Sequence, residues 1–314
     1  MRILVTGGAG FIGSHIVEGL LATGHEVGVL DDLSTGRRDN VPREAAFFEG
    51  DLRDRERTRA ILRDYRPEAV SHQAAQASVA VSMRDPRLDA EVNVIGGIHL
   101  LDACTESGSR VGRVVFASTG GAIYGEVAEG TRADEFTPPR PASPYAIHKL
   151  AFEQLLSVYR TRGLATTVLR YANVYGPRQD PHGEAGVVAI FFDAAQRGAR
   201  LRINARKVEG DPGCVRDYVY VEDVARANLL ALAGTIEQPA LNIGTGEETT
   251  TLELARTVLQ RVGRELAVDC GPPRGGDLER SVLDPSLAIR YLGALVTLER
   301  GLGRTHAHYA GRSA

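Results

Sequence analysis

Residues 6–13 read TGGAGFIG, with glycines at positions 7, 10 and 13. A short aliphatic run at residues 2–6 precedes them, and a helical pattern over residues 11–21 follows. Between a strand and a helix, such glycines let the backbone turn tightly and approach a pyrophosphate, which the N–H groups of the helix N-terminus then bind. This stretch predicts a dinucleotide-binding site at the start of a Rossmann-type domain.

Strand and helix patterns alternate beyond this stretch. Strands are expected at residues 26–31, 45–49, 68–72, 111–118 and 165–171, and helices at residues 54–65, 87–107 and 144–162. The alternation predicts an α/β fold with a doubly wound parallel sheet.

Loop length and composition change after residue 173. Loops become longer and richer in Gly and Pro, as in residues 175–186, 204–214 and 271–277. Helices are expected at residues 187–197, 221–233 and 251–262, and residues 241–244 read as a strand that returns to the first sheet. We therefore expect an NAD-binding Rossmann domain at 1–173, to which 215–246 returns, and a smaller C-terminal α/β substrate-binding lobe over 174–314.

Composition excludes several classes of protein. Apolar residues make up 43% of the chain, enough for a full core, and the formal net charge of -3 comes with no basic stripe for nucleic acid. No apolar run approaches the ~20 residues that span a membrane, and the N-terminus does not resemble a signal peptide. Cys104, Cys214 and Cys270 lie far apart, as free thiols in a reducing cytoplasm would.

Two acidic residues follow the second strand at the spacing typical of an NAD site. Asp31 is placed to accept hydrogen bonds from the ribose hydroxyls, and with Asp32 it disfavours the 2′-phosphate of NADP. Asp51, after the third strand, suits the adenine amino group. The small residues of the 73–76 turn let a cofactor lie across the end of the fourth strand, and Asn93 is expected to hold backbone or water nearby.

Tyr145 and Lys149 are four residues apart in one helix, so they share a face. A nearby ammonium favours the tyrosinate form and makes the phenol a better general base. The hydroxyl of Ser118 or Thr119, at the end of the fifth strand, is expected to bridge the phenol and a substrate oxygen, with Thr119 preferred. The pair predicts hydride transfer between NAD and an alcohol.

These residues resemble the extended short-chain dehydrogenase/reductase superfamily. Within it, the chain is similar to the bacterial UDP-glucose 4-epimerases of the NAD-dependent epimerase/dehydratase family. The similar segments span almost the whole chain: 6–15 (TGGAGFIGSH), 31–36 (DDLSTG), 72–79 (HQAAQASV), 116–126 (FASTGGAIYGE), 143–149 (SPYAIHK), 169–191, 215–228 (VRDYVYVEDVARAN), 242–246 (NIGTG) and 272–281 (PPRGGDLERS).

The resemblance implies an isomerase that inverts C4 of a UDP-hexose without net redox change. Tyr145 takes the proton of the C4 hydroxyl while NAD takes the hydride, and the 4-keto sugar turns before hydride returns to its other face. It also implies a homodimer in which the 87–107 helix and the Tyr145 helix form a four-helix bundle.

The residue patterns and the resemblance together predict three sets of site residues. The catalytic set is Ser118, Thr119, Tyr145 and Lys149. The cofactor set is Gly7, Gly10, Phe11, Ile12, Gly13, Asp31, Asp32, Leu33, Ser34, Thr35, Gly36, Asp51, Leu52, Gln73, Ala74, Ala75, Gln76, Asn93, Ser118, Tyr145, Lys149, Tyr171 and Ala172. The substrate set is Ser78, Thr119, Gly120, Tyr145, Asn173, Val187, Val188, Arg216, Tyr218, Arg274, Asp277 and Ser281.

The chain departs from its relatives in two places. Gly120 stands four residues before Tyr124, where many relatives have Ser or Thr, so the turn after Thr119 must be reshaped. The 205–214 loop is longer than the Gly-Asp-Gly loop usual before the Arg-Asp-Tyr motif. Ser281 is small at a position near which relatives set pocket size, and this predicts that N-acetylated UDP-hexoses are also accepted.

Alternative functions differ in the residues that they require. A 4,6-dehydratase needs an Asp-Glu pair after Thr119, where Gly120 and Gly121 stand instead. A uronate epimerase or decarboxylase stays open, because three arginines are candidates to meet a carboxylate: Arg84, Arg178 and Arg202. A non-catalytic NAD sensor would not need the Tyr/Lys pair.

No metal site is expected. His306 and His308 fall in a C-terminal segment expected to be mobile and to offer no further ligands, and His148 is expected to be a solvated surface side chain.

Overall fold

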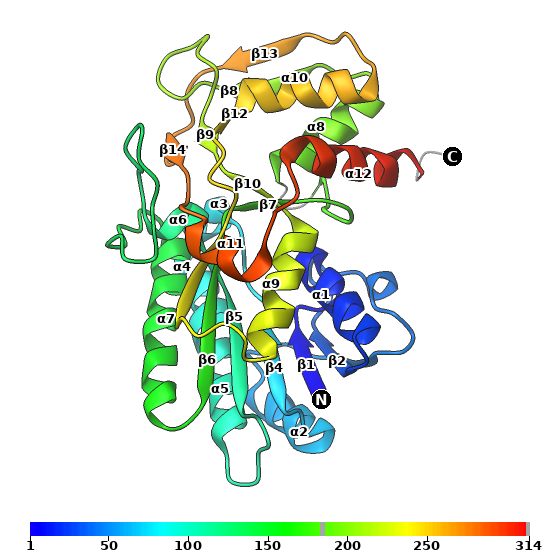
Figure 1. Ribbon diagram of the computed structural model, residues 1–314, viewed down its shortest axis with the longest axis vertical. Helices are drawn as coiled ribbons and strands as arrows, with labels where there is room; N and C mark the ends of the chain where they lie inside the picture. Colours follow the sequence, from blue (N-terminus) through cyan, green and yellow to red (C-terminus); the bar gives the residue numbers. More distant parts are fainter. Residues whose placement is uncertain (183–185, 312–314) are drawn as a thin grey trace. The chain divides into compact units, whose positions relative to one another are not determined.

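The computed structural model describes residues 1–182 and 186–311, which fall into two units (Figure 1). Unit 1 comprises Met1–Thr119, Pro141–Arg170 and Ala225–Leu241. Unit 2 takes its residues from Gly120–Arg140, Tyr171–Val224 and Asn242–Ala314. Parts of the expected 175–186 loop and of the 169–191 motif, residues 183–185, lie outside the described residues.

A seven-stranded sheet organises unit 1. Its strands are β1 (Arg2–Thr6), β2 (Glu26–Asp31), β3 (Ala46–Glu49), β4 (Ala69–His72), β5 (Arg113–Thr119), β6 (Ala165–Tyr171) and β11 (Ala240–Ile243), in the order β11-β6-β5-β4-β1-β2-β3. β1 pairs in parallel with both β2 and β4, so the strand order reverses between β1 and β4. In doubly wound sheets ligands bind at the carboxyl ends of the strands at such a reversal.

The expected α/β fold and its strands are confirmed. The strand expected at residues 241–244 does join the first sheet, at its edge beside β6.

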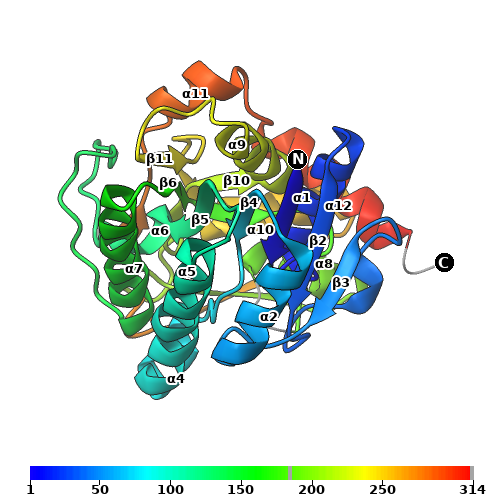
Figure 2. The same ribbon diagram turned by 90° about the horizontal axis from the view of Figure 1, so that it is seen from below.

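Helices cover both faces of this sheet, as Figure 2 shows looking from below. α1 (Phe11–Ala22) lies beside the later turns of α9 (Val221–Leu232), where a Cβ on Gly19 would be 3.3 Å from Leu229. α2 (Arg55–Tyr65), α5 (Gly97–Thr105) and α7 (Pro144–Thr161) cover the other face. The shorter helices are η1 (Arg38–Asn40), α3 (Val79–Arg84), α4 (Pro86–Ala90) and η2 (Glu91–Gly96).

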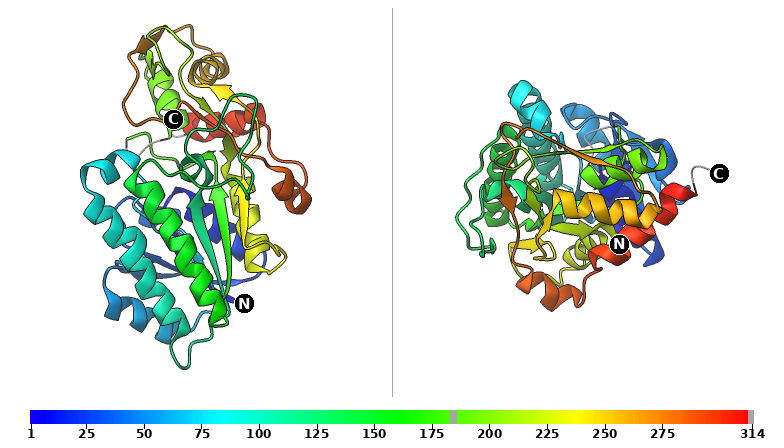
Figure 3. Two further views of the ribbon diagram at one scale, coloured as in Figure 1. Left: turned by 90° about the vertical axis from the view of Figure 1, so that its left-hand side faces the viewer. Right: turned by 90° about the horizontal axis from the view of Figure 1, so that it is seen from above.

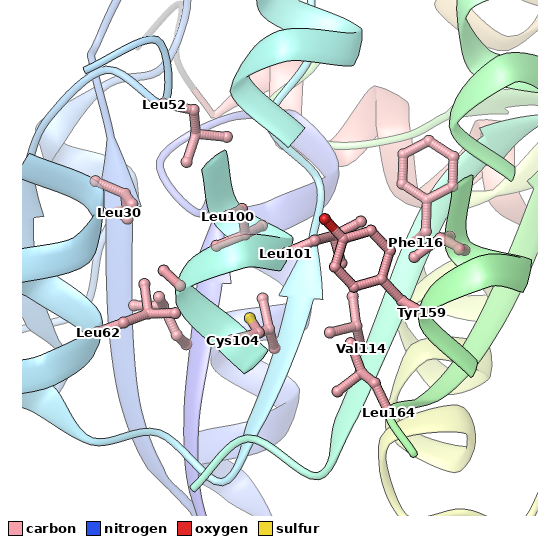
Figure 4. Packing of buried hydrophobic residues seen from close by; sticks show 14 of the residues in the cluster. Leu30, Leu52, Leu62, Leu100, Leu101, Cys104, Val114, Phe116, Tyr159 and Leu164 are labelled. Carbon is pink, nitrogen blue, oxygen red and sulfur yellow. The ribbon is translucent and has the colours of Figure 1, made fainter. Parts of the chain in front are cut away.

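The core of unit 1 fills the space between the sheet and α2, α5 and α7 (Figure 4). Phe116 of β5 and Phe152 of α7 are both buried, with ring centroids 4.6 Å apart. Cys104 lies in the same cluster, where burial raises the pKa of its thiol. The expected free thiols are confirmed for Cys104, Cys214 and Cys270.

The helix expected over residues 87–107 is not regular. α4, η2 and α5 follow one another, and η2 is a π-helical segment. Asn93 within η2 is buried, and its amide bonds to the backbone of Gln76. Single π-helical turns inside α-helices are frequent at functional sites, where they turn a side chain inward. α3, which Ser78 caps, was not predicted from the sequence.

Unit 2 consists of short strands and helices. They are α6 (Gly120–Ile123), β7 (Asn173–Tyr175), α8 (Val187–Gln196), β8 (Leu201–Asn204), β9 (Val215–Arg216), β10 (Tyr218–Tyr220), β12 (Thr249–Thr250), α10 (Thr251–Val262), β13 (Val268–Gly271), β14 (Arg280–Ser281), α11 (Ser286–Leu292) and α12 (Leu298–Ala310). The strands form three small sheets, β10-β7, β12-β9-β14 and β13-β8. α8, α10 and α12 pack against one another (Figure 3, right). The aromatic core of this unit includes Tyr175, Phe192 and Tyr220.

The expectation of a mobile segment around His306 and His308 is wrong. Both residues lie in α12, which buries Leu302 and Tyr309 in the core of unit 2. The ring of His306 stacks on Phe192 with centroids 5.9 Å apart. Amphipathic packing of the helix, and not metal binding, accounts for its order.

None of the helices in residues 1–182 and 186–311 combines the length and apolar character needed to cross a membrane.

Candidate active site

The glycine-rich turn after β1 has no room for side chains. A Cβ on Gly13 would lie 2.1 Å from the carbonyl oxygen of Gly7, and one on Gly7 would lie 2.6 Å from the backbone nitrogen of Ala74. Gly7 also has φ +67°, a left-handed conformation that favours glycine. α1 begins at Phe11 without a side-chain cap, so the N–H groups of Phe11 and Ile12 are left for an anion.

Asp31 and Asp32 build the loop that follows β2. The carboxylate of Asp31 accepts hydrogen bonds from the backbone N–H groups of Ala9 and Leu33, both at 2.9 Å. Asp32 accepts from the backbone N–H of Ser34 at 3.0 Å and from its hydroxyl at 2.7 Å. Burial raises the pKa of Asp31, although these backbone donors act in the opposite direction. Each oxygen of Asp31 still has a lone pair for a ribose hydroxyl.

A Cβ on Gly36, at the end of this loop, would come within 2.7 Å of Asp31 Oδ1. Thr35 completes the loop between Ser34 and Gly36. The glycine is therefore required for the loop to close over the carboxylate.

Asp51 is already paired within its own turn. Its side chain binds the guanidinium of Arg53 at 2.5 Å, and this hydrogen bond is the largest cause of its lowered pKa. The next residue, Leu52, is buried, and its carbonyl oxygen meets His99 Nδ1 at 3.0 Å. An adenine contact would have to share Asp51 with Arg53.

The turn after β4 is held from several sides. The amide of Gln73 donates to Ser71 Oγ and to Asn228 Oδ1, both at 3.0 Å. Asn93 bonds to the backbone N–H of Gln76 at 3.0 Å and to its carbonyl at 2.9 Å. The prediction that Asn93 holds backbone is confirmed. Ala74 and Ala75 lie between Gln73 and Gln76, which these bonds fix. The backbone of Ala74 is the part that passes close to Gly7.

These turns follow β1, β2 and β4, which are neighbours in the sheet. A glycine cradle, a helix N-terminus without a side-chain cap and the acid predicted to bind ribose, Asp31, stand at the ends of those strands. The residues present therefore fit a dinucleotide cofactor.

Lys149 is a buried ammonium in the first turns of α7. Its Nζ donates to the carbonyl oxygen of Ala117 at 2.9 Å and lies 4.8 Å from the ring centroid of Phe116 and 5.9 Å from that of Tyr145. Desolvation lowers the pKa of Lys149 to about 8, while Asp89 and Glu153 raise it. The lysine is thus still charged at neutral pH, as the predicted role beside Tyr145 requires.

Ser118 and Thr119 differ in what their hydroxyls bind. The Ser118 hydroxyl donates to Glu153 Oε1 at 2.5 Å, and Glu153 also forms an ion pair with Arg170 at 2.6 Å. The hydroxyl of Thr119 makes no hydrogen bond to any of the described residues. This difference favours Thr119 as the group that reaches a substrate. Glu153 was missed from the sequence because its partners are distant in the chain.

The interpretation of His148 as a solvated side chain is wrong. Its Nδ1 meets Oδ1 of Asp89 at 2.5 Å, and Asp89 has a fully buried side chain. His148 points off the Tyr145 face of α7, as expected, but toward α4 and not toward solvent.

Hydrogen bonds of Asp217 join two sequence motifs, residues 215–228 and 242–246. Asp217 is buried and accepts from the backbone N–H and hydroxyl of Thr245 at 2.8 and 2.7 Å and from the N–H of Gly246 at 3.0 Å. Its own carbonyl oxygen accepts from Asn173 Nδ2 at 3.1 Å. Ala172 follows Tyr171 at the end of β6 and donates its N–H to Ile243 at 2.8 Å. The 242–246 motif therefore holds the backbone on which Asn173 lies.

Several predicted substrate residues have partners within unit 2. Arg274 and Asp277 form a two-bond ion pair at 3.0 and 2.7 Å. Arg216 donates to the carbonyl oxygens of Val215 and Leu278 at 3.0 and 2.6 Å. Tyr218 lies in the aromatic core, where burial raises the pKa of its phenol.

Val187 and Val188 open α8. Val188 is buried in the same core and Val187 packs against it. Their contribution to a ligand is therefore limited to backbone N–H groups in the first turn of the helix.

The two segments in which the sequence departs from its relatives, around Gly120 and in the 205–214 loop, both have a defined structure. Gly120 begins the short helix α6 immediately after Thr119, and the buried Ser281 donates its hydroxyl to the carbonyl oxygen of Gly121 at 3.1 Å. In the 205–214 loop, Asp211 accepts from four backbone N–H groups, those of residues 206, 207, 208 and 213. Although desolvation opposes them, these bonds lower the pKa of Asp211.

The alternatives gain no support from the geometry. Arg84 is exposed on α3, and Arg202 is exposed on β8 beside Gly271. The backbone N–H of Arg178 bonds to His308 Nε2 at 3.3 Å. Within residues 1–182 and 186–311, no group of three or more His, Cys, Asp or Glu side chains is arranged to hold a metal ion.

Comparison with known proteins agrees with the site. The sequence pattern of the NAD dependent epimerase/dehydratase family matches residues 3–244. The UDP-glucose 4-epimerase of Mycolicibacterium smegmatis is 43% identical over 321 residues, covering 100% of each chain.

Two solved structures are similar over their whole length. The UDP-glucose 4-epimerase of Thermus thermophilus, in complex with NAD, is 57% identical with a TM-score of 0.94 over 99% of each chain. That of Thermotoga maritima, with UDP-glucose, is 45% identical with a TM-score of 0.93 over 100% of each chain. The resemblance predicted from the motifs is confirmed.

We predict that Gly13→Ala removes bound NAD. The new Cβ would meet the Gly7 carbonyl at 2.1 Å, so the turn must move, at a cost on the order of 1–3 kcal/mol in unfolding free energy. NAD released from the denatured protein measures the effect. Gly112→Ala is the control, since a Cβ there meets no described atom within 4 Å. Wild-type NAD content in Gly13→Ala would contradict the assignment of this turn.

We also predict that removing the Thr119 hydroxyl and removing the Ser118 hydroxyl have different effects on kcat. Thr119→Val should lower kcat about 10–100-fold, because a hydroxyl positioned for proton transfer is lost. Ser118→Ala should lower kcat less than about 3-fold and mainly reduce stability, by about 1 kcal/mol for one hydrogen bond. Steady-state rates and thermal unfolding of both variants measure this, and a reversed order of the two kcat losses would assign the role to Ser118.

Proposed function

The chain belongs to the NAD-dependent epimerase/dehydratase family, and we propose that it inverts C4 of a UDP-hexose, interconverting UDP-glucose and UDP-galactose through a 4-keto sugar. The observation that carries the proposal is the buried Lys149 ammonium one helical turn from Tyr145. The relatives with this activity in their names are similar over the whole chain.

Tyr145 acts as the general base and acid of the reaction. It takes the proton of the C4 hydroxyl, and the Lys149 ammonium stabilises the phenolate that remains. When bound, NAD supplies the centre that accepts the C4 hydride and returns it to the other face of the sugar. Thr119 donates and accepts hydrogen bonds between the phenol and the C4 oxygen, and Tyr145 finally returns the proton.

Different residues bind the cofactor and the UDP-sugar in this proposal. Unit 1 holds the cofactor through the glycine turn, Asp31 and the 73–76 turn. Unit 2 holds the UDP-sugar through Asn173 and the arginines Arg216 and Arg274, since guanidinium groups match pyrophosphate oxygens in pairs. Asp277 orients Arg274 through their ion pair.

A homodimer accompanies this function. Met83 on α3, Ile95 in η2 and Ile147 on α7 are 59%, 45% and 50% exposed, on helices that pack side by side. Exposed apolar side chains on these packed helices suit the four-helix bundle expected from the resemblance.

We place the protein in the cytoplasm, as the free thiols suggested. Three unpaired cysteines are compatible with a reducing compartment.

We expect purified protein to convert UDP-glucose to UDP-galactose without added NAD, because hydride returns to the sugar in each cycle. Tyr145→Phe should slow this at least ~100-fold, the usual scale for the loss of a general base. Tyr159→Phe, on the same helix but bonded to Asp102, is the control and should stay near the wild-type rate. A Tyr145→Phe protein of unchanged rate would refute the assignment.

We further expect turnover of UDP-N-acetylglucosamine, because Ser281 leaves more room than a large side chain would. Product analysis by chromatography, with UDP-glucose measured on the same preparation as the reference, tests this. Undetectable UDP-N-acetylgalactosamine alongside normal UDP-galactose formation would sink the proposal for the pocket.

The dimer is expected to depend on the apolar face. Ile95→Asp combined with Ile147→Asp should give a monomer in analytical ultracentrifugation, because burying two carboxylates in an interface is unfavourable. Ile289→Asp, an equally exposed position on α11, should leave the dimer intact. A monomeric wild-type protein would contradict the proposal.

A further inference from the structure

Asp89 is a buried carboxylate that joins two segments of unit 1. It lies in α4, and its side chain has no exposed surface. Oδ1 accepts from Nδ1 of His148 at 2.5 Å, and Oδ2 accepts from Nε2 of Gln76. His148 is in α7, which runs beside the helix formed by α4, η2 and α5 (Figure 3, left). The two partners thus come from the Lys149 helix and from the turn after β4.

Both partners connect directly to groups of the site. His148 immediately precedes Lys149, so its hydrogen bond fixes the rotation of that turn of α7. Gln76 accepts through Oε1 from the backbone N–H of Ser78 at 2.5 Å, and its Nε2 also donates to the Ser78 carbonyl at 3.0 Å. With Asn93 on its backbone, the whole 76–78 segment is set by side chains around Asp89.

Asp89 also acts on Lys149 through its charge. Burial favours the neutral amine, and the carboxylates of Asp89 and Glu153 oppose this, with Asp89 the stronger of the two. The charge of Glu153 is balanced by a direct ion pair with Arg170. Asp89 has no arginine or lysine among its hydrogen-bond partners in the described chain, so its charge acts on Lys149 with less competition.

We propose that Asp89 is a positioning residue for the C4 inversion, which sets the Tyr145–Lys149 turn through His148 and ties that turn to the 76–78 segment through Gln76. The role rests on the proposed function, because it depends on Tyr145 and Lys149 acting on the substrate. Asp89 itself touches neither substrate nor cofactor in this account.

The pH dependence follows from the groups that face Lys149. They are Asp89 from α4, Tyr145 and Glu153 from α7, and His72 from β4. Burial, with a smaller contribution from Lys149, lowers the pKa of His72 to about 3, so His72 is neutral throughout the useful range. Removing the Asp89 charge lowers the pKa of Lys149 further, and Lys149 then loses its proton at lower pH. The alkaline limb of kcat should therefore move to lower pH.

The test is the pH profile of kcat for Asp89→Asn with UDP-glucose. We expect kcat within about 3-fold of wild type at pH near 6.5 and at least ~10-fold lower at pH near 9, since each unit of pKa changes the ratio of the two forms tenfold. KM for UDP-glucose and the amount of bound NAD should stay near wild type, because Asn93 and the Gln76–Ser78 hydrogen bonds still hold the 76–78 segment. Tyr145→Phe, measured in the same series, reports on the proposed function separately.

Asp102→Asn is the matched control. Asp102 also joins the long helix to α7, through Tyr159 at 2.8 Å, but at the far end from Lys149. Its profile should coincide with that of wild type. An Asp89→Asn profile that coincides with wild type, or a loss of kcat equal at every pH, would overturn the role of Asp89 even if Tyr145→Phe is inactive.

A second variant applies if Asp89→Asn does not fold. His148→Leu removes the hydrogen bond that sets this turn of α7 but leaves the Asp89 charge in place, so kcat should fall by a similar factor at every pH. His148→Gln keeps an N–H donor and should restore the wild-type profile. A His148→Leu profile identical to wild type would also contradict the proposal.

Discussion

The proposed active site depends on holding one ammonium group, Lys149, charged where almost no water reaches it. A buried lysine tends to lose its proton, because transfer from water disfavours the charged form. Here the Ala117 carbonyl, the face of the Phe116 ring and two buried carboxylates offset that tendency. Each carboxylate has its own donors, and those donors come from α7, β5, β6 and the turn after β4. The Rossmann sheet is thus the frame that brings these charges together around a single nitrogen.

The same sheet brings the proposed cofactor-binding turns and the proposed catalytic residues together in unit 1. The glycine turn follows β1, Asp31, the acid proposed to bind ribose, ends β2, and the 73–76 turn follows β4. Thr119 ends β5, and α7 returns across that strand with Tyr145 and Lys149. Parallel strands end on one edge of the sheet, so the three turns that would hold the cofactor share that edge with Thr119. The family pattern over residues 3–244 covers all of these segments.

Local patterns in the sequence predicted the glycine turn, the order of strands and helices, and the Tyr145–Lys149 pair, since each depends on neighbouring residues. The environment of Lys149 could not be predicted in this way. Asp89 and His148 are 59 positions apart, and Ser118 and Glu153 are 35 apart, so only the folded chain pairs them. The π-helical segment η2 was missed for the same reason, because Asn93 turns inward to bond a distant backbone. The prediction for α12 was wrong because it rested on the His residues and not on the apolar face of the helix.

The central claim is that hydride leaves C4 of the sugar and returns to the same carbon within one enzyme. The most direct test uses UDP-glucose with deuterium at C4, incubated in ordinary water without added NAD, with the product analysed by NMR and mass spectrometry. We predict UDP-galactose that keeps its deuterium at C4, since the hydride never exchanges with solvent. UDP-galactose with hydrogen from solvent at C4 would contradict it, because inversion would then proceed by removal and return of a proton.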